Sequence, residues 1–172
     1  EKENRGMRQM NNLNQLIANY TQALNQGEIQ IAYKGIMEFM GKLRAELIKK
    51  YPEYQVSGIY QGYMDMSYFS MASDSLKDKG LKIAIVYLHE TGCFEVWLSA
   101  RNREIARKYV SEHVAKTSDE VTLFHDPENQ DALVEGVLVS GPDFENQEKL
   151  IEIIEQGVER FIKVILISLF SL

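Results

Sequence analysis

The amino-acid sequence predicts an α+β domain, a mostly antiparallel sheet of two consecutive hairpins plus one or two further strands, with helices packed on it. Residues 81–89 are apolar on both alternating sets of side chains, as is typical of a strand in the middle of a covered sheet. From about Arg101 the apolar spacing changes from that of a strand to that of a helix. A strand order that left residues 81–89 at an edge would contradict this fold.

The central hairpin is predicted to turn at residues 90–92 and to return along residues 93–99. Gly92 can adopt the positive φ that a short hairpin loop requires. In the return strand one set of side chains is apolar, and the alternate set contains Glu95 and Trp97.

A second hairpin is predicted over residues 54–71, with its turn near residues 61–62. Five of the nine tyrosines lie between residues 51 and 68. Their rings combine apolar area with polar tips, so this hairpin could line a pocket or a binding face. The alternative is plain packing against the preceding helix. The candidate ligand-binding residues are Tyr60, Tyr63 and Tyr68, together with Trp97 on the neighbouring hairpin.

Helices are predicted before the first hairpin. Asn12 and Gln15 resemble a capping box at the start of one helix, and a second helix covers about residues 29–50. Gly35 and Gly41 interrupt the second helix, where we expect them to permit close packing.

The C-terminal half is predicted to add an edge strand at residues 121–124, a last strand at residues 134–140 and a final helix. We expect residues 1–172 to form a single α+β domain, with residues 1–11 frayed.

Composition limits the possible functions. The formal net charge of -6 and the isoelectric point near 5.2 disfavour general binding to nucleic acid or to an anionic membrane. Cys93 is the single cysteine, which fits a reducing compartment, and residues 1–8 are charged rather than apolar. We therefore expect a cytoplasmic protein.

Two motifs resemble an uncharacterised bacterial domain family. Its members share a hairpin with a YQGYMDM-like core and an FEVWL-like strand followed by N-R, which stand here at residues 60–66 and 94–103. The likeness covers roughly residues 31–165. It implies no catalytic role for any residue.

The order of the predicted elements also resembles, remotely, the core of PD-(D/E)XK nucleases. The resemblance implies Asp65 and Glu95 as Mg²⁺ ligands, with Glu46 on the preceding helix as a third carboxylate. Trp97 stands where the family has lysine, so Lys82 would have to substitute from the neighbouring strand. The alternative is that these carboxylates face solvent or pair with basic side chains. Carboxyl groups more than about 8 Å apart could not share one cation.

Other chemistry is weakly indicated. The spacing of His89, His113 and His125 matches no metal motif, so we expect structural histidines, no metal site and no cofactor other than Mg²⁺ under the nuclease hypothesis. Cys93 on a sheet strand is expected to be a small buried apolar residue.

A basic cluster marks the helix that follows the central hairpin. Arg101, Arg103, Arg107 and Lys108 lie near its start, where cations oppose the helix dipole and an anion would relieve the conflict. Arg101 and Arg103 are therefore candidate anion-binding residues. A charged outer face is the alternative.

The C-terminal tail is apolar nearly all round over residues 161–172, yet it is too short to span a bilayer. One face can complete the core, and the other would then be exposed, so we expect a homodimer through this helix. The alternative is a tail buried wholly within its own chain.

Three hypotheses for the function follow. The first is a non-enzymatic binding or interaction module, built around the Tyr/Met-rich hairpin, with an unknown small molecule or protein as partner. The second is a nuclease-like hydrolase, active or degenerate, and the third is an anion or small-molecule sensor at residues 101–108. A pocket lined by the tyrosines would favour the first.

Overall fold

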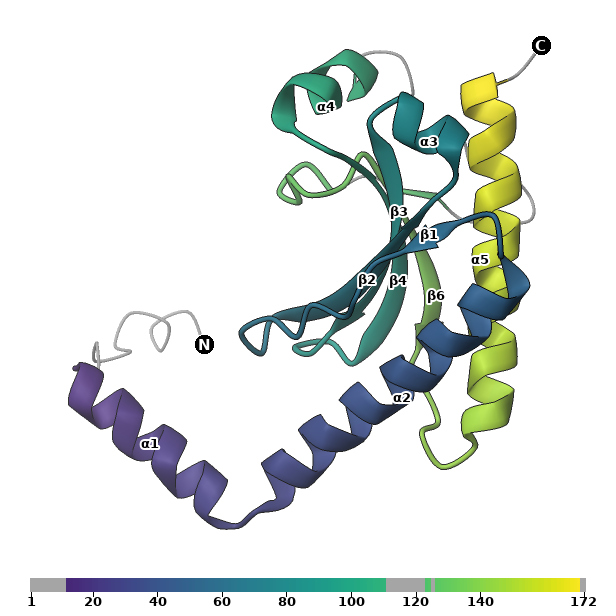
Figure 1. Ribbon diagram of the computed structural model, residues 1–172. Coiled ribbons are helices and arrows are strands. Elements are labelled where there is room, and N and C mark those ends of the chain that lie inside the picture. Colours follow the sequence, from purple (N-terminus) through teal and green to yellow (C-terminus); the bar gives the residue numbers. More distant parts are fainter. Residues whose placement is uncertain (1–11, 111–122, 125, 171–172) are drawn as a thin grey trace, which may run out of the picture. The chain divides into compact units, whose positions relative to one another are not determined.

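The computed structural model describes residues 12–110, 123–124 and 126–170 (Figure 1). The chain divides into two compact units, an N-terminal unit of residues 1–38 and a C-terminal unit of residues 39–172. A single domain over residues 1–172 stays a prediction.

The N-terminal unit consists of α1 (Leu13–Asn25) and the first part of α2 (Glu28–Lys50). The side chain of Asn12 accepts a hydrogen bond from the Gln15 amide over 2.9 Å, so the predicted N-cap is confirmed. Leu13, Leu16, Ile17 and Tyr20 recur at helical spacing, and more than half of each side chain is exposed. α1 thus has an apolar stripe at its surface.

The C-terminal unit is built on a six-stranded sheet in which every pairing is antiparallel. From one edge to the other the strands are β1 (Gln55–Val56), β2 (Met66–Ala72), β3 (Leu81–Leu88), β4 (Cys93–Ala100), β6 (Val134–Ser140) and β5 (Leu123–Phe124). Because β3 lies between β2 and β4, the predicted fold class is confirmed. The two hairpins are β1–β2 and β3–β4, and β5 and β6 are the two further strands.

Both predicted turns are present. Gly92 has a φ of +63°, and its amide bonds to the Leu88 carbonyl over 2.8 Å, closing the β3–β4 hairpin. The β1–β2 hairpin turns around residues 61–65, and Tyr60 and Tyr68 form an isolated bridge beside it. A short helix, α3 (Asp74–Asp78), lies between the two hairpins.

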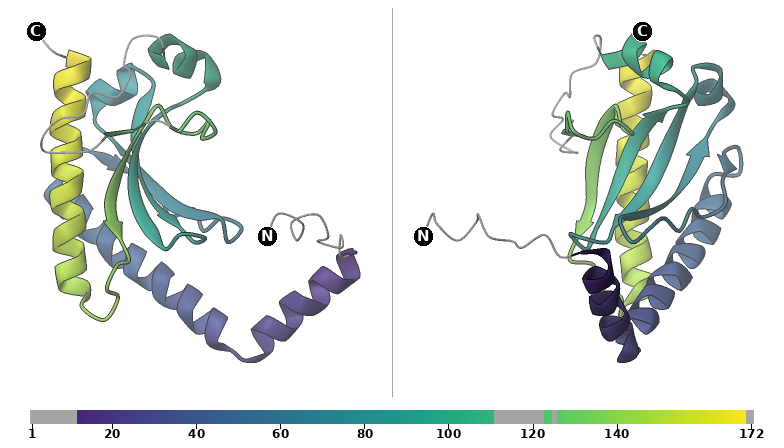
Figure 2. Two further views of the ribbon diagram at one scale, coloured as in Figure 1. Left: turned by 180° about the vertical axis from the view of Figure 1, so that it is seen from behind. Right: turned by 90° about the vertical axis from the view of Figure 1, so that its left-hand side faces the viewer.

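One face of the sheet is covered by helices. The pairing register places Phe69, Ile85 and Val96 in one row of this face, and all three are buried. Residues 39–50 of α2 and the helix α5 (Gln147–Phe170) pack on it, as Figure 2 shows. The Lys50 ammonium and a Glu159 carboxylate oxygen lie 3.4 Å apart, which joins the two helices side by side.

The glycines of α2 do not serve close packing. An ideal Cβ at Gly35 or Gly41 would meet nothing within 4 Å. That expectation was wrong, because the contacts of α2 with the sheet come from large side chains, among them Phe39 and Leu43.

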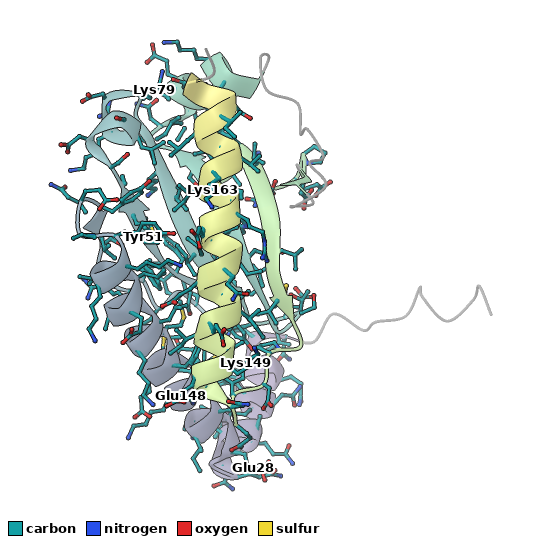
Figure 3. All side chains as sticks on the ribbon, turned by 90° about the vertical axis from the view of Figure 1, so that its right-hand side faces the viewer. Glu28, Tyr51, Lys79, Glu148, Lys149 and Lys163 are labelled. Carbon is teal, nitrogen blue, oxygen red and sulfur yellow. The ribbon has the colours of Figure 1, made fainter. Side chains whose placement is uncertain are left out.

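α5 packs mainly within its own unit. Phe161, Ile162 and Ile165 are buried, whereas Ile167 is 68 % exposed. Figure 3 views this side of the unit, with Lys149 and Lys163 on the outer surface of α5. The side chain of Phe170 and the whole of Leu172 lie outside the description. Among the described residues no helix combines the length and apolarity needed to cross a membrane.

The opposite face of the sheet carries a second apolar cluster. Its buried members are Ala84, Val86, Trp97 and Ala132. Both sets of side chains on β3 are therefore buried, as the sequence predicted. Of the described residues, α4 (Arg103–Val110) and residues 126–133 cover part of this face.

Candidate functional site

The partly covered face of the sheet contains a cavity of about 690 Å³, which we call the groove. Its floor is formed by the strands, and its walls by the start of α4 and by residues 128–133. Its lining residues are Tyr60, Met66, Tyr68, Lys82, Ala84, Trp97, Ser99, Ala100, Arg101, Asn102, Arg103, Ala106, Glu128, Asn129, Gln130, Asp131, Ala132 and Leu133. The volume is within the usual range for small-molecule sites, roughly 300–1,000 Å³.

The aromatic part of the groove comes from two hairpins. The rings of Tyr60 and Tyr68 lie 5.1 Å apart between centroids, and Tyr60 is 44 % exposed. Trp97 is only 5 % exposed, so it forms the floor and offers little of its ring for stacking. The two tyrosine rings are therefore the surfaces on which a flat ligand could stack.

The phenol of Tyr60 is a hydrogen-bond donor at neutral pH. Desolvation, and then the neighbouring Tyr63 and Asp65, raise the pKa of this hydroxyl above its ordinary value. A protonated phenol in the lining of the groove can donate to a polar group of a ligand.

Three cations line the same groove. Lys82 lies on β3, its ammonium 6.0 Å from the centre of the Tyr68 ring, while Arg101 and Arg103 follow β4. Within the part of the chain that the structure describes, no carboxylate lies within ion-pair distance of any of the three. An anionic ligand group would therefore find cations that no described acid neutralises.

The backbone around these cations is fixed by local bonds. The Arg101 amide donates to the Gly80 carbonyl over 2.7 Å, and Asn102 Oδ1 accepts from the Ile105 amide over 2.9 Å at the start of α4. Gly80 has a φ of +71°, and the Ile105 side chain occupies the space that a Cβ at position 80 would need. The first turn of α4 is thus held against the end of the sheet.

The other wall of the groove depends on a residue that the sequence analysis did not single out. Glu135 is 1 % exposed, and its carboxylate accepts hydrogen bonds from the Asp126 amide and from Asn129 Nδ2. Ser99 Oγ donates to the Asp131 carbonyl over 2.6 Å. These bonds fasten residues 126–131 to β4 and β6. The available signal was an acidic residue inside the apolar strand at residues 134–140.

A second cavity of about 540 Å³ adjoins the groove. Lys82 and Arg101 line both cavities, while Lys77 and Gln55 line only the second. The second cavity lies toward the β1 edge of the sheet, between β1 and the end of α3.

The structure brings together most of the predicted ligand-binding residues. Tyr60, Tyr68 and Trp97 of the first hypothesis and Arg101 and Arg103 of the third all line the groove. Tyr63 does not belong to the lining, and 87 % of its surface is exposed.

The carboxylates of the nuclease hypothesis are not brought together. The Asp65 carbonyl bonds to the His89 amide, whereas Glu95 lies in a row with Val86 and Tyr68. Their backbone positions are therefore roughly 10 Å apart across the strands and roughly 10 Å apart along them.

Other contacts engage these carboxylates. Asp65 Oδ1 accepts a hydrogen bond from the Tyr63 amide. Hydrogen bonds from the backbone, of which the one from Met66 has the largest effect, lower the pKa of Asp65. Glu46 lies on α2, which covers the opposite face of the sheet from Glu95, and pairs with Lys49 over 3.2 Å. Lys82 is in the groove. Among residues 12–110, 123–124 and 126–170, no group of three or more His, Cys, Asp or Glu side chains could hold a metal ion.

A serine and a histidine meet beside the β1–β2 turn. Ser67 Oγ lies 2.8 Å from His89 Nε2 and donates to the Gln61 carbonyl over 2.5 Å. Since its only proton points to Gln61, Ser67 accepts from His89 and cannot pass a proton to it. Ser67 is also fully buried, so this pair ties the turn to β3 and does not form a nucleophile.

Cys93 is equally unsuited to nucleophilic chemistry. It is 8 % exposed, and burial raises the pKa of its thiol, which keeps it protonated. The expectation of a small buried apolar residue is met.

The fold places this chain among α+β domains with an antiparallel sheet, one face covered by helices and the other hollowed by a groove. The chain belongs to the family described as Domain of unknown function (DUF7000), whose model matches residues 13–169. This match confirms the predicted membership of an uncharacterised domain family. No curated protein and no solved structure matches the chain.

Proposed function

We propose that this domain is a non-enzymatic binding module that holds a small organic molecule in the groove. One observation carries the proposal: the tyrosine-rich hairpin and the basic residues after β4, which the sequence suggested as separate sites, line a single cavity. A concave apolar floor with a few convergent polar groups is the usual form of a ligand site.

The lining suggests which residues would provide affinity for a ligand and which would orient it. Tyr68 and Met66 supply most of the apolar area, whose burial contributes roughly 25 cal/mol per Å². Lys82, Arg101 and the Tyr60 hydroxyl supply directional polar contacts. We therefore expect a ligand with one flat apolar part and one anionic part.

A fragment screen by thermal shift tests the proposal. Ala106 lines the groove from α4 and is half-buried, so Ala106→Phe should fill the groove without removing a polar contact. Ala45 is exposed on α2, and Ala45→Phe is the matched control. Fragments that stabilise the wild type and Ala45→Phe but not Ala106→Phe would support the proposal. Equal stabilisation of all three proteins would refute it.

Two properties accompany the proposal. We propose a cytoplasmic location, which the free, buried thiol of Cys93 supports. We also propose a homodimer through α5, supported by the exposed Ile167 near the end of that helix.

A further inference from the structure

The junction between the two cavities is formed by Lys82 and Arg101, which line both. Lys82 lies on β3 and Arg101 directly follows β4, and both are at the same end of the sheet because Lys82 pairs with Ser99 and Leu81 with Ala100. A ligand group placed between these two cations could be reached from the groove and from the second cavity alike.

The position of Lys82 suits an anion at this junction. Its backbone is on the floor of the groove, and the pairing of Lys82 with Ser99 directs both side chains to the groove face. The Tyr68 ring is 6.0 Å from its ammonium. A ligand ring stacked on Tyr68 would therefore have its substituent beside Lys82.

The charge around the junction exceeds what one carboxylate would balance. Lys77 lines the second cavity and Arg103 lines the groove, so four cations line the two cavities that meet at the junction. The acids of the groove, Glu128 and Asp131, are exposed and lie on the opposite wall, in residues 126–133. A phosphate monoester carries about -1.5 to -2 charges at neutral pH and presents three acceptor oxygens.

The opposite wall suits hydroxyl and amino groups. Residues 128–131 are Glu, Asn, Gln and Asp, and all four line the groove. The groove thus offers an aromatic surface beside a cationic junction, and a polar wall opposite them. These are the complements of a ring, a polyhydroxylated linker and a phosphate.

We infer that the ligand is a phosphorylated aromatic compound of the nucleotide class, with its phosphate between Lys82 and Arg101 and its ring against Tyr60 and Tyr68. This inference rests on the proposed function and specifies the ligand of the same groove. The second cavity would accept a substituent beyond the phosphate.

Trp97 provides the readout, because it is the only tryptophan of the chain and forms the floor of the groove. Its fluorescence would be followed during titration with adenosine monophosphate, adenosine and inorganic phosphate, and with phenyl phosphate and benzoate as a second pair. We expect each phosphate ester to bind at least ten-fold more tightly than its partner compound. Raising the salt concentration should weaken the phosphate esters and leave adenosine unchanged.

Charge-removing variants locate the phosphate. Lys82→Gln and Arg101→Gln should each weaken adenosine monophosphate about ten-fold and change adenosine less than two-fold. The controls Lys49→Gln and Arg160→Gln remove the same charges from exposed positions on the helices and should bind like the wild type. Arg101 is exposed and Lys82 half-buried, so folding should survive, and the salt series tests the inference without any variant.

The outcomes separate the two claims. If benzoate binds as well as phenyl phosphate, or if adenosine equals its monophosphate, the inference is overturned although the groove still binds ligands. The proposed function itself fails if no compound changes the fluorescence of Trp97 and no fragment loses its stabilising effect in Ala106→Phe.

Discussion

The indole of Trp97 donates a hydrogen bond from Nε1 to Oε1 of Glu95 over 3.0 Å. The two side chains are two residues apart on the groove face of β4. The bond joins a predicted ligand contact to a predicted Mg²⁺ ligand. Because the carboxylate accepts from the indole, we assign Glu95 the role of orienting the groove floor.

This relationship predicts different effects for two substitutions of Glu95. Glu95→Ala removes the acceptor of a buried indole N–H and should lower the free energy of unfolding by about 1–2 kcal/mol. Glu95→Gln retains an oxygen acceptor and should unfold within about 0.5 kcal/mol of the wild type. Urea denaturation followed by Trp97 fluorescence measures both, and equal losses in the two variants would contradict the assigned role.

His89 should make stability depend on pH. Burial lowers the pKa of His89 below its ordinary 6.5, while the nearby Asp65 raises it to a smaller extent. The neutral ring is therefore favoured in the folded protein, and its contribution is fully present above about pH 6.5 and lost as the pH falls through the lower folded pKa.

The matched variant for this prediction is His89→Gln, which does not titrate and can still donate to Ser67. The thermal midpoint of the wild type should fall more steeply from pH 7 to pH 5 than that of the variant. Parallel curves would show that His89 does not contribute to the pH dependence.

Two glycines should respond oppositely to alanine. A Cβ at Gly80 would lie 2.4 Å from Ile105 Cδ1, at a φ of +71°, so Gly80→Ala should destabilise the fold by about 1–2 kcal/mol. Gly41 is inside α2 with nothing within 4 Å of an ideal Cβ, so Gly41→Ala should stabilise the fold by about 0.5–1 kcal/mol. Urea denaturation measures both, and a stabilising Gly80→Ala would show that α4 does not pack as described.

The homodimer prediction concerns the end of α5. If Ile167 is part of the subunit contact, Ile167→Asp should convert a dimer into a monomer of about half the mass, because a charge would enter an apolar interface. Light scattering at micromolar concentration measures this. A wild-type monomer with the same mass as the variant would mean that α5 completes only the core of its own chain.

The sheet could be predicted from sequence because its signals are local. In residues 81–88 both alternating sets of side chains are apolar, which indicates a strand with a neighbour on each side. The turn at Gly92 indicates the central hairpin. The short helix α3 could not be predicted, because it is five residues long and Leu76 is its only buried residue. A single apolar residue shows no helical periodicity.

The site was predicted only in pieces. Tyr60, Tyr68, Trp97, Arg101 and Arg103 were each proposed, but that they line one groove follows from the pairing of β2, β3 and β4. Sequence spacing predicted the β3–β4 hairpin, but it contains no information on the pairing of β2 with β3. The role of Glu135 was also hidden, because its partners Asp126 and Asn129 belong to a loop without a regular pattern.

The most direct test of the central claim, that the groove is the binding site, is a crystal structure of the domain soaked with the best fragments and with adenosine monophosphate. We predict a ligand ring against Tyr68, above the floor formed by Trp97, with an anionic oxygen about 2.7–2.9 Å from the Lys82 ammonium. Ligands bound only elsewhere on the molecule, with the groove filled by solvent, would contradict the account.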